Sequence, residues 1–208
     1  MTQKRSGKGR CSACRLNNNL CLCDKIATMK QQSLTKVSLI VHVSEIILPS
    51  NTAQFVKLIL PESAEHFVRG RVEQPFSSEP VLSRPGTPLF LYPHEDSQEL
   101  NADFLARHPG PYHLIVPDGN WHQARRVRKR ETAFQSVPSV RLPPGILGEY
   151  QLRKAQHPEW VSTYEATAHA LGIIEGTELR DRMMEFFRLW VRTTLYNRTS
   201  KVEYLTHG

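Results

Sequence analysis

The chain of 208 residues is long enough for one α/β domain with a small appendage and short for two full domains. Its 39% hydrophobic and 23% charged residues exclude a disordered protein. The net charge of +7 favours a polyanionic partner, although a basic surface that only keeps a protein in solution gives the same charge. The sequence has neither the roughly 18 consecutive apolar residues of a membrane span nor the apolar core of a secretory signal, so we expect a cytoplasmic protein.

All four cysteines lie in one short segment, Cys11-x2-Cys14-x6-Cys21-x-Cys23. In a reducing compartment such a cluster binds a metal more often than it forms disulfides. Four thiolates complete a tetrahedral Zn²⁺ site, which predicts a closed, structural zinc finger; an iron–sulfur cluster and free thiols are the alternatives. Since so short a segment cannot bury a core, metal binding would supply its folding energy. We therefore predict a basic zinc-finger segment at 1–33 and a second domain at 34–208.

Strand and helix signals alternate along the second domain. Apolar and β-branched runs predict strands at 34–43, 88–92, 112–116 and 137–142. Helices are predicted after the capping residues 50–52, around 97–107, from Ser162 with its capping-box partner Glu165, and over 177–197. This alternation predicts an α/β fold with a largely parallel sheet. Ligands of such sheets bind beyond the carboxyl ends of the strands, where residues 42–45 and 117–121 fall.

The segment Asp118-Gly119-Asn120-Trp121 connects the strand at 112–116 to a strongly basic helix. An acid, a glycine and an indole at a strand-to-helix turn predict a small-molecule pocket. The helix then carries five cations in six residues: Arg125, Arg126, Arg128, Lys129 and Arg130. Neighbouring residues cannot share one helix face, so we expect three of the five to contact nucleic acid. A pocket beside a cationic face predicts an enzyme that brings a small cofactor to a nucleic acid.

Four blocks, in this order, resemble the DTW-domain family, specifically its bacterial tRNA-uridine aminocarboxypropyltransferases. The blocks span residues 11–166: the cysteine motif; His42-Val43-Ser44-Glu45 with Asn51-Thr52; Asp118-Gly119-Asn120-Trp121 with Gln123-Ala124-Arg125-Arg126; and Tyr150-Gln151-Leu152-Arg153-Lys154 with Ser162-Thr163-Tyr164-Glu165-Ala166. One departure is Asn120, where the family has threonine, which puts any task of a hydroxyl at this position in doubt. A lesser departure is Val43, where a proline often follows the histidine.

The resemblance implies a SPOUT-like α/β fold whose C-terminal part is knotted around a pocket for S-adenosylmethionine. It also implies a reaction, the transfer of the 3-amino-3-carboxypropyl group of S-adenosylmethionine to N3 of a uridine, with release of 5′-methylthioadenosine. The expected substrate is tRNA, at a uridine of the variable loop, because the cysteine segment resembles that of the tRNA-acting branch. Ribosomal RNA is the alternative substrate.

This chemistry needs a base, because the weakly acidic N3–H of uridine must lose its proton. We expect Asp118 to be that base, with Glu45 and Glu165 as the alternative carboxylates. Each of the three also has a purely structural explanation. Asp118 can be the N-cap of the basic helix, Glu165 can serve only its capping box, and Glu45 can simply end a strand.

The transfer also needs the donor's methyl group buried and its γ-carbon aimed at the nucleophile. Trp121 is expected to form part of that apolar wall, the alternative being a core tryptophan. The residues expected to contact S-adenosylmethionine are His42, Val116, Pro117, Asn120, Trp121, Tyr150, Leu152, Arg153, Ser162 and Thr163. Those expected to contact RNA are Arg125, Arg126, Arg128, Lys129, Arg130 and Lys154.

Two rival functions use the same residues. A SPOUT-type RNA methyltransferase would release S-adenosylhomocysteine in place of methylthioadenosine. A non-enzymatic, zinc-containing RNA-binding module would use the basic face without binding any cofactor. The sequence does not predict an oligomeric state.

Overall fold

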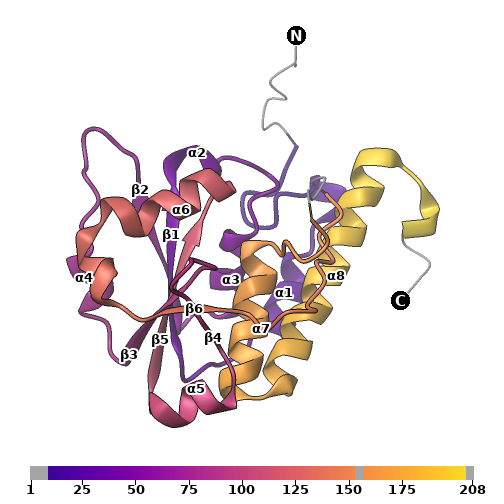
Figure 1. Ribbon diagram of the computed structural model, residues 1–208. Coiled ribbons are helices and arrows are strands. Elements are labelled where there is room, and N and C mark those ends of the chain that lie inside the picture. The colour runs from indigo at the N-terminus through magenta and orange to yellow at the C-terminus, as the bar shows by residue number, and fades with distance from the viewer. Residues whose placement is uncertain (1–8, 153–156, 205–208) are drawn as a thin grey trace.

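Parallel strands form the centre of the protein, seen in the computed structural model of Figure 1, which describes residues 9–152 and 157–204. The strands are β1 (Lys36–His42), β2 (Ala64–Arg69), β3 (Thr87–Leu91), β4 (Gln98–Glu99), β5 (Tyr112–Asp118) and β6 (Ser139–Arg141). They lie in the order β2-β1-β5-β3-β6-β4, and every neighbouring pair is parallel. The predicted α/β fold with a parallel sheet is therefore confirmed. The strand β5 is one of the two central strands of the sheet.

Helices flank this sheet on both faces (Figure 1). They are α1 (Cys23–Met29), α2 (Val43–Ile46), α3 (Ala53–Ile59), α4 (Glu79–Leu82), α5 (Ala102–Arg107), α6 (Trp121–Arg130), α7 (Thr163–Glu175) and α8 (Thr177–Thr199), with short 3-10 helices η1 (Asn18–Leu20), η2 (Thr132–Ser136) and η3 (Val202–Tyr204). In Figure 1, α2 and α6 lie at the top, at the carboxyl ends of β1 and β5, and α5 lies at the bottom.

Alternate strand residues enter two hydrophobic cores, as expected for a sheet covered on both faces. Leu39 and Leu114 belong to the core that α1, α3, α7 and α8 share. Ile40 and Ile115, the next residues along the same strands, belong to the core formed with α4, α6 and η2. The sheet is thereby covered by a hydrophobic core on each of its two faces.

The structure corrects two details of the predicted elements. The helix predicted around 97–107 is present only over Ala102–Arg107, because Gln98 and Glu99 pair with β6 as the edge strand β4. The strand β2 was not predicted, since its sequence AEHFVR mixes polar and apolar residues without alternation. Within the described residues, no helix combines the length and the apolar character that a membrane crossing requires.

The cysteine segment packs against the rest of the protein. Cys14, Leu16 and Ile26 are buried in the same core as the sheet and α8. Trp190 of α8 donates from Nε1 to the Cys14 carbonyl at 3.2 Å, and Arg15 donates from Nε to Gln54 Oε1 at 2.9 Å. The predicted boundary at residues 33 and 34 therefore does not separate two hydrophobic cores.

Candidate active-site cleft and cysteine cluster

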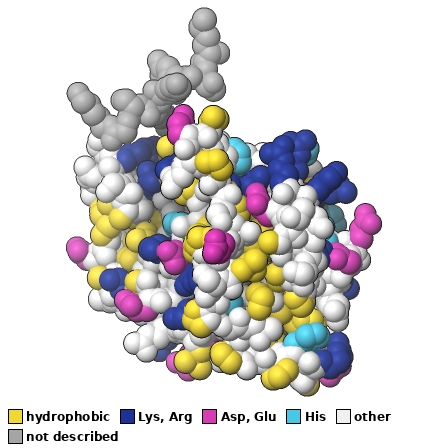
Figure 2. Space-filling view, turned by 90° about the vertical axis from the view of Figure 1, so that its left-hand side faces the viewer, with side chains coloured by type: hydrophobic (Ala, Val, Ile, Leu, Met, Phe, Trp, Pro, Cys, Tyr) yellow, Lys and Arg dark blue, Asp and Glu magenta, His cyan; other side chains and the backbone are white. Residues whose placement is uncertain are grey.

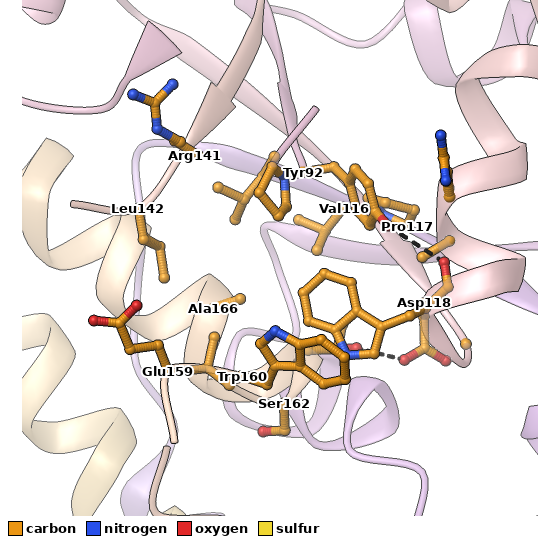
Figure 3. Close-up of a pocket in the computed structure, with 18 of the residues that line it drawn as sticks. Tyr92, Val116, Pro117, Asp118, Arg141, Leu142, Glu159, Trp160, Ser162 and Ala166 are labelled. Carbon is orange, nitrogen blue, oxygen red and sulfur yellow. Dashed lines mark hydrogen bonds between the residues drawn. The ribbon is translucent and has the colours of Figure 1, made fainter. Parts of the chain in front are cut away.

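A cleft of about 1370 Å³ lies at the carboxyl ends of the strands, where parallel sheets bind their ligands. Its lining comes from Glu45 after β1, residues 91–96 at the end of β3, residues 116–121 at the end of β5, and Arg141 and Leu142 at the end of β6. The loop between β6 and α7 contributes the opposite wall, including Trp160 and Ser162 (Figure 3). The cleft is thus assembled from four strand ends and one long connection.

The turn from β5 into α6 explains the motif Asp118-Gly119-Asn120-Trp121. Gly119 has a φ of 140°, and a Cβ there would lie 2.7 Å from Gln123 Oε1, so any other residue would strain the backbone and displace the Gln123 side chain. Asn120 is the N-cap of α6: its Oδ1 accepts from the Gln123 backbone N–H at 2.9 Å, and Gln123 Oε1 accepts from the Asn120 N–H at 2.9 Å. A threonine hydroxyl can cap a helix in the same way, which accounts for Asn120 at this position.

Asp118 is therefore not the cap of α6, and that alternative is wrong. Its side chain lies at the floor of the cleft in a residue that is only 4% exposed. Asn51 Nδ2 donates to Asp118 Oδ2 at 2.5 Å, and Thr163 Oγ1 donates to Asp118 Oδ1 at 2.7 Å. Two segments that are distant from Asp118 in the sequence thus orient its carboxylate.

Aromatic side chains form a wall of the cleft that Asp118 also lines. The indole rings of Trp121 and Trp160 lie 4.8 Å apart, inclined by 41°, and the ring of Tyr92 lies 5.7 Å from Trp121. The Tyr92 hydroxyl donates to the Trp121 carbonyl at 3.3 Å, and burial raises the pKa of Tyr92. Trp121 is 39% exposed and lines the cleft, so it is not a core tryptophan. Figure 3 shows Ala166 next to the Trp160 ring, with Val116 and Leu142 farther away in the cleft lining.

Glu165, one of the predicted catalytic carboxylates, is a structural residue. It is fully buried and does not line the cleft. Its Oε2 accepts from the Ser162 N–H at 2.6 Å, closing the predicted capping box, and its Oε1 accepts from the Glu149 N–H at 2.5 Å. Burial raises its pKa, against the effect of these hydrogen bonds. Glu45, by contrast, is 7% exposed and lines the cleft.

Most of the predicted cofactor contacts line the cleft, namely Val116, Pro117, Asn120, Trp121, Tyr150, Ser162 and Thr163. His42 and Leu152 do not, and their prediction is corrected. His42 Nδ1 accepts from the Ser44 N–H at 3.3 Å, and Leu152 is buried in the core, where its carbonyl accepts from Arg198 of α8. Arg153 and Lys154 lie outside the described residues.

The five cations of α6 point in different directions because a helix turns by 3.6 residues. Arg125 and Lys129, four residues apart, line the cleft beside Trp121. Arg126 and Arg130 are exposed and lie at helical spacing from Gln123, on another side of α6. Figure 2, which views the molecule from the α4 side, shows Lys and Arg side chains gathered near the top, at the level of α6.

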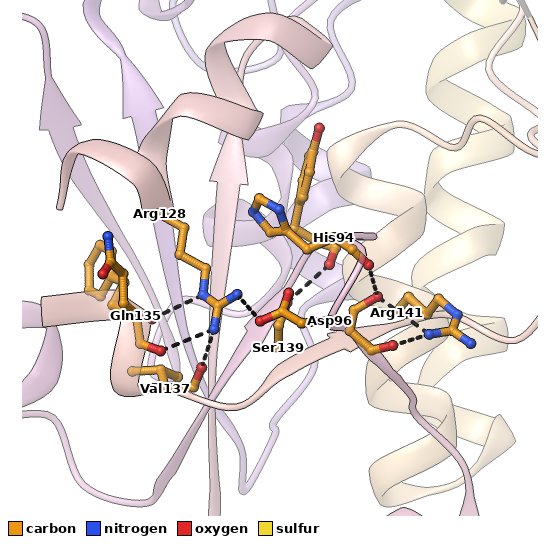
Figure 4. Close-up of polar contacts among 10 residues, drawn as sticks. His94, Asp96, Arg128, Gln135, Val137, Ser139 and Arg141 are labelled. Atoms are coloured by element: carbon orange, nitrogen blue, oxygen red, sulfur yellow. Dashed lines mark hydrogen bonds and ion pairs between the residues drawn. The ribbon is translucent and has the colours of Figure 1, made fainter. Parts of the chain in front are cut away.

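Arg128 holds the fold together, contrary to its predicted contact with RNA. Its side chain is 12% exposed and forms a 2.6 Å ion pair with Asp96 (Figure 4). Its guanidinium also donates to the carbonyls of Phe134, Gln135 and Val137 at 3.1–3.3 Å. The Arg128 side chain thus contacts η2, its flanking residues and the loop after β3. The helix α6 therefore offers a ligand four cations rather than five.

The four cysteines form one compact cluster, with all Sγ atoms within 4.8 Å of one another. The Sγ atoms of Cys11 and Cys23 are 3.4 Å apart, and those of Cys14 and Cys21 are 3.7 Å apart. Tetrahedral Zn²⁺ with bonds of about 2.3 Å places its sulfurs about 3.8 Å from each other. The Cys11 N–H donates to the Leu16 carbonyl at 2.9 Å and tightens the turn between the first two ligands. The donor set and its spacing fit a zinc ion.

The curated relatives of this chain include three proteins named tRNA-uridine aminocarboxypropyltransferase 2. The proteins of Macaca fascicularis and Mus musculus are 28% and 27% identical over 79% of this chain, which spans 56% of their length. The protein of Drosophila melanogaster is 24% identical over 85% of this chain and 71% of its own. The chain therefore spans about half the length of the mammalian relatives.

No solved structure matches the chain. The model of the DTW domain family matches residues 8–195, which include the cysteine cluster, the whole sheet and the cleft. The chain belongs to the DTW domain family.

Proposed function

We propose that this protein transfers the 3-amino-3-carboxypropyl group of S-adenosylmethionine to N3 of a uridine in tRNA. The observation that carries the proposal is Asp118, a carboxylate fixed by two donors at the floor of an aromatic cleft in a DTW-domain protein. The names of the relatives support the same transfer. We include in the proposal the SPOUT-like knot of the C-terminal part, which the family resemblance implies.

The cleft has the size and the lining to hold both a nucleoside-containing donor and a base. S-adenosylmethionine, when bound, supplies a sulfonium with three electrophilic carbons, so the protein must select one of them. The indoles of Trp121 and Trp160 provide an apolar wall against which a methyl group and an adenine ring can pack. A methyl group held against this wall is kept away from the nucleophile, so the aminocarboxypropyl carbon can face the nucleophile. The protein thus selects the reacting carbon by positioning the donor.

Asp118 accepts the N3 proton in this proposal, since a carboxylate within hydrogen-bond reach is the natural base for a weakly acidic N–H. The N3–carbon bond then forms as the carbon–sulfur bond breaks, and the electron pair of that bond stays on sulfur as methylthioadenosine leaves. Asn51 and Thr163 are positioning residues, because they touch Asp118 and fix the direction of its oxygens. Besides Asp118, Glu45 is a buried carboxylate of the cleft lining, and it suits the donor's ammonium group.

The cationic residues around the cleft suit an RNA whose target base is turned out of its stack. Arg125 and Lys129 line the cleft itself, where the phosphates next to the target base would lie. We propose tRNA as the substrate, with a uridine of the variable loop as the target. The word tRNA in the relatives' names supports this choice over ribosomal RNA.

We also propose that the cysteine cluster holds one structural zinc ion. Cys11, Cys14, Cys21 and Cys23 use all four tetrahedral positions, which leaves no open position for catalysis. The ion would hold the segment in the shape that packs against Trp190 and α8.

Mass spectrometry of nucleosides from a tRNA transcript tests the proposed activity. After incubation with the protein and S-adenosylmethionine, we expect 3-(3-amino-3-carboxypropyl)uridine in the variable loop. A parallel incubation with ribosomal RNA should give none. A methylated nucleoside, or modification of ribosomal RNA instead of tRNA, would overturn the proposal.

A further inference from the structure

Arg69, the last residue of β2, is a buried cation with little to bind it. The residue is 5% exposed, yet its guanidinium carries five N–H donors. Within residues 9–152 and 157–204 it makes one hydrogen bond, from Nη1 to the Gln123 carbonyl at 3.3 Å, and no ion pair. Buried charges in proteins are normally paired or fully hydrogen-bonded, because leaving water costs them several kcal/mol. Among the residues that the structure describes, Arg69 therefore forms no ion pair with the anionic partner that its burial calls for.

The groups around Arg69 are mostly basic. His42 is its partner across the β1–β2 register, and the His42 ring packs so closely over Gly70 that a Cβ there would lie 2.8 Å from Nε2. Burial lowers the pKa of both Arg69 and His42, and the charge of Arg130 lowers both further. Arg69 also lowers the pKa of His42, whereas the carboxylate of Glu45 raises it. Glu131 is the carboxylate that acts on Arg69, and its effect is smaller than that of burial or of Arg130.

We propose that Arg69, His42 and Arg130 bind one phosphodiester of the RNA backbone. A guanidinium offers parallel N–H donors that match two phosphate oxygens, and an anion there would satisfy the buried charge. The site lies on the Gln123 side of α6, whereas Arg125 and Lys129 line the cleft. That the RNA is a tRNA rests on the proposed function; the phosphate site itself does not.

The position of this site gives it a use in presenting the target base. Gln123 connects the two sides of α6, since its carbonyl accepts from Arg69, its Nε2 donates to Ser44 Oγ at 3.3 Å, and its backbone N–H donates to the cap Asn120 at the cleft rim. An RNA strand that is bound by Arg69 on one side of α6 and by Arg125 on the other side crosses the N-terminal half of this helix. Two phosphates gripped on opposite sides of one helix would fix the direction in which the nucleotide enters the cleft.

The salt dependence of binding to a tRNA transcript tests the site. Arg69→Gln should lower the slope of log K against log salt by about 0.7–0.9, the value for one phosphate contact. Adding Arg130→Gln should lower it little further, because both residues hold the same phosphate, whereas adding Arg125→Gln should remove a second step of similar size. Arg107→Gln, on α5 at the far end of the sheet, is the matched control and should leave the slope unchanged.

An unchanged slope in Arg69→Gln would overturn the proposal. A decrease of the slope in Arg69→Gln/Arg130→Gln that equals the sum of the decreases in the two single variants would also overturn it. If thermal melts show that Arg69→Gln is not folded, His42→Asn and Arg130→Gln allow the same comparison, because asparagine keeps the acceptor that His42 offers the Ser44 N–H. For a shared phosphate, the fold-loss of affinity in the double variant falls short of the product of the single losses.

Inorganic phosphate separates an RNA site from a site for a free anion. The RNA assignment would be contradicted if inorganic phosphate saturates the site at Arg69 while Arg69→Gln binds tRNA as the wild-type protein does. These measurements need no turnover. A wild-type protein that binds tRNA but forms no modified uridine would refute the proposed function while leaving the slopes to decide on this site.

Discussion

The cysteine cluster and the cleft are built in opposite ways. The cluster takes its four ligands from residues 11–23, and the two pairs of sulfurs already lie 3.4 and 3.7 Å apart. The cleft takes its residues from four strand ends and the loop before α7, and Asp118 is fixed by Asn51 and Thr163 from two other segments. A bound ion can order a short segment by itself, whereas the cleft inherits its order from a sheet covered on both faces. Damage to the first should therefore appear as lost stability, and damage to the second as lost activity.

The largest effect on stability is expected from the cluster. Cys11→Ser/Cys23→Ser removes two ligands, so the purified protein should fall from about one zinc per chain to none. Because Cys14, Leu16 and Ile26 belong to the main core, the melting temperature of the whole protein should drop by on the order of 10 °C or more. Metal analysis and a thermal melt measure both quantities. Ser12→Ala, an exposed change in the same turn, is the control; iron with visible absorbance, or no metal, would refute the zinc assignment.

Asp118→Asn should give the opposite result, a loss of activity in a folded protein. We expect the single-turnover transfer rate to fall by at least ~10²-fold, because the proton acceptor is lost. Stability should fall by only about 1–3 kcal/mol, since the asparagine amide then faces Asn51 or Thr163, which both donate to Asp118.

Thr163→Val tests the positioning of Asp118 with the carboxylate kept. It removes the donor to Asp118 Oδ1, and the transfer rate should fall by roughly tenfold, consistent with the sensitivity of catalysis to misplacement. A near-normal rate in Asp118→Asn would show that neither residue takes part in the reaction.

Glu165→Gln distinguishes the role of Glu165 from that of Asp118, another buried carboxylate. Its oxygens accept from the Ser162 and Glu149 backbone N–H groups, and an amide can accept only one of these bonds. The protein should lose about 1–3 kcal/mol of stability, or about 2–4 °C per kcal/mol, while the transfer rate at low temperature stays within a few-fold of normal. A rate loss as large as that of Asp118→Asn at an unchanged melting temperature would return Glu165 to the catalytic residues.

The smallest effects are expected from Arg126→Gln and Arg128→Gln, which compare two nearby arginines of α6. Arg128→Gln leaves carbonyls of η2 and its flanking residues without their donor, so it should lower the melting temperature and leave the salt slope of tRNA binding unchanged. Arg126→Gln should do the reverse, with a slope lower by about 0.7–0.9 if Arg126 contacts one phosphate. Equal slopes for the two variants would contradict this division of the helix.

What the sequence predicts well here is local. The cysteine spacing predicts the cluster, the β-branched run predicts β1, and Ser162 with Glu165 predicts the capping box of α7. In each case the interacting residues are neighbours in the chain. Their geometry follows from a few backbone angles and does not require the rest of the fold.

The contacts that the sequence does not predict are long-range or depend on orientation. Arg128 belongs to the fold because Asp96, 32 residues away, lies beside it. Trp160 lies in a loop without any periodic pattern, so its contact with Trp121 could not be anticipated. Asp118 and Asn120 are both good caps by type, and only the backbone shows that Asn120 holds that position.

The central claim is that the cleft transfers an aminocarboxypropyl group, and the nucleoside released from the donor tests it most directly. Chromatography of the reaction of wild-type protein with tRNA and S-adenosylmethionine should show 5′-methylthioadenosine, in an amount equal to the modified uridine formed. Asp118→Asn should release neither product at a comparable rate. Release of S-adenosylhomocysteine with a methylated RNA would contradict the account, because the cleft would then present the methyl carbon to the nucleophile.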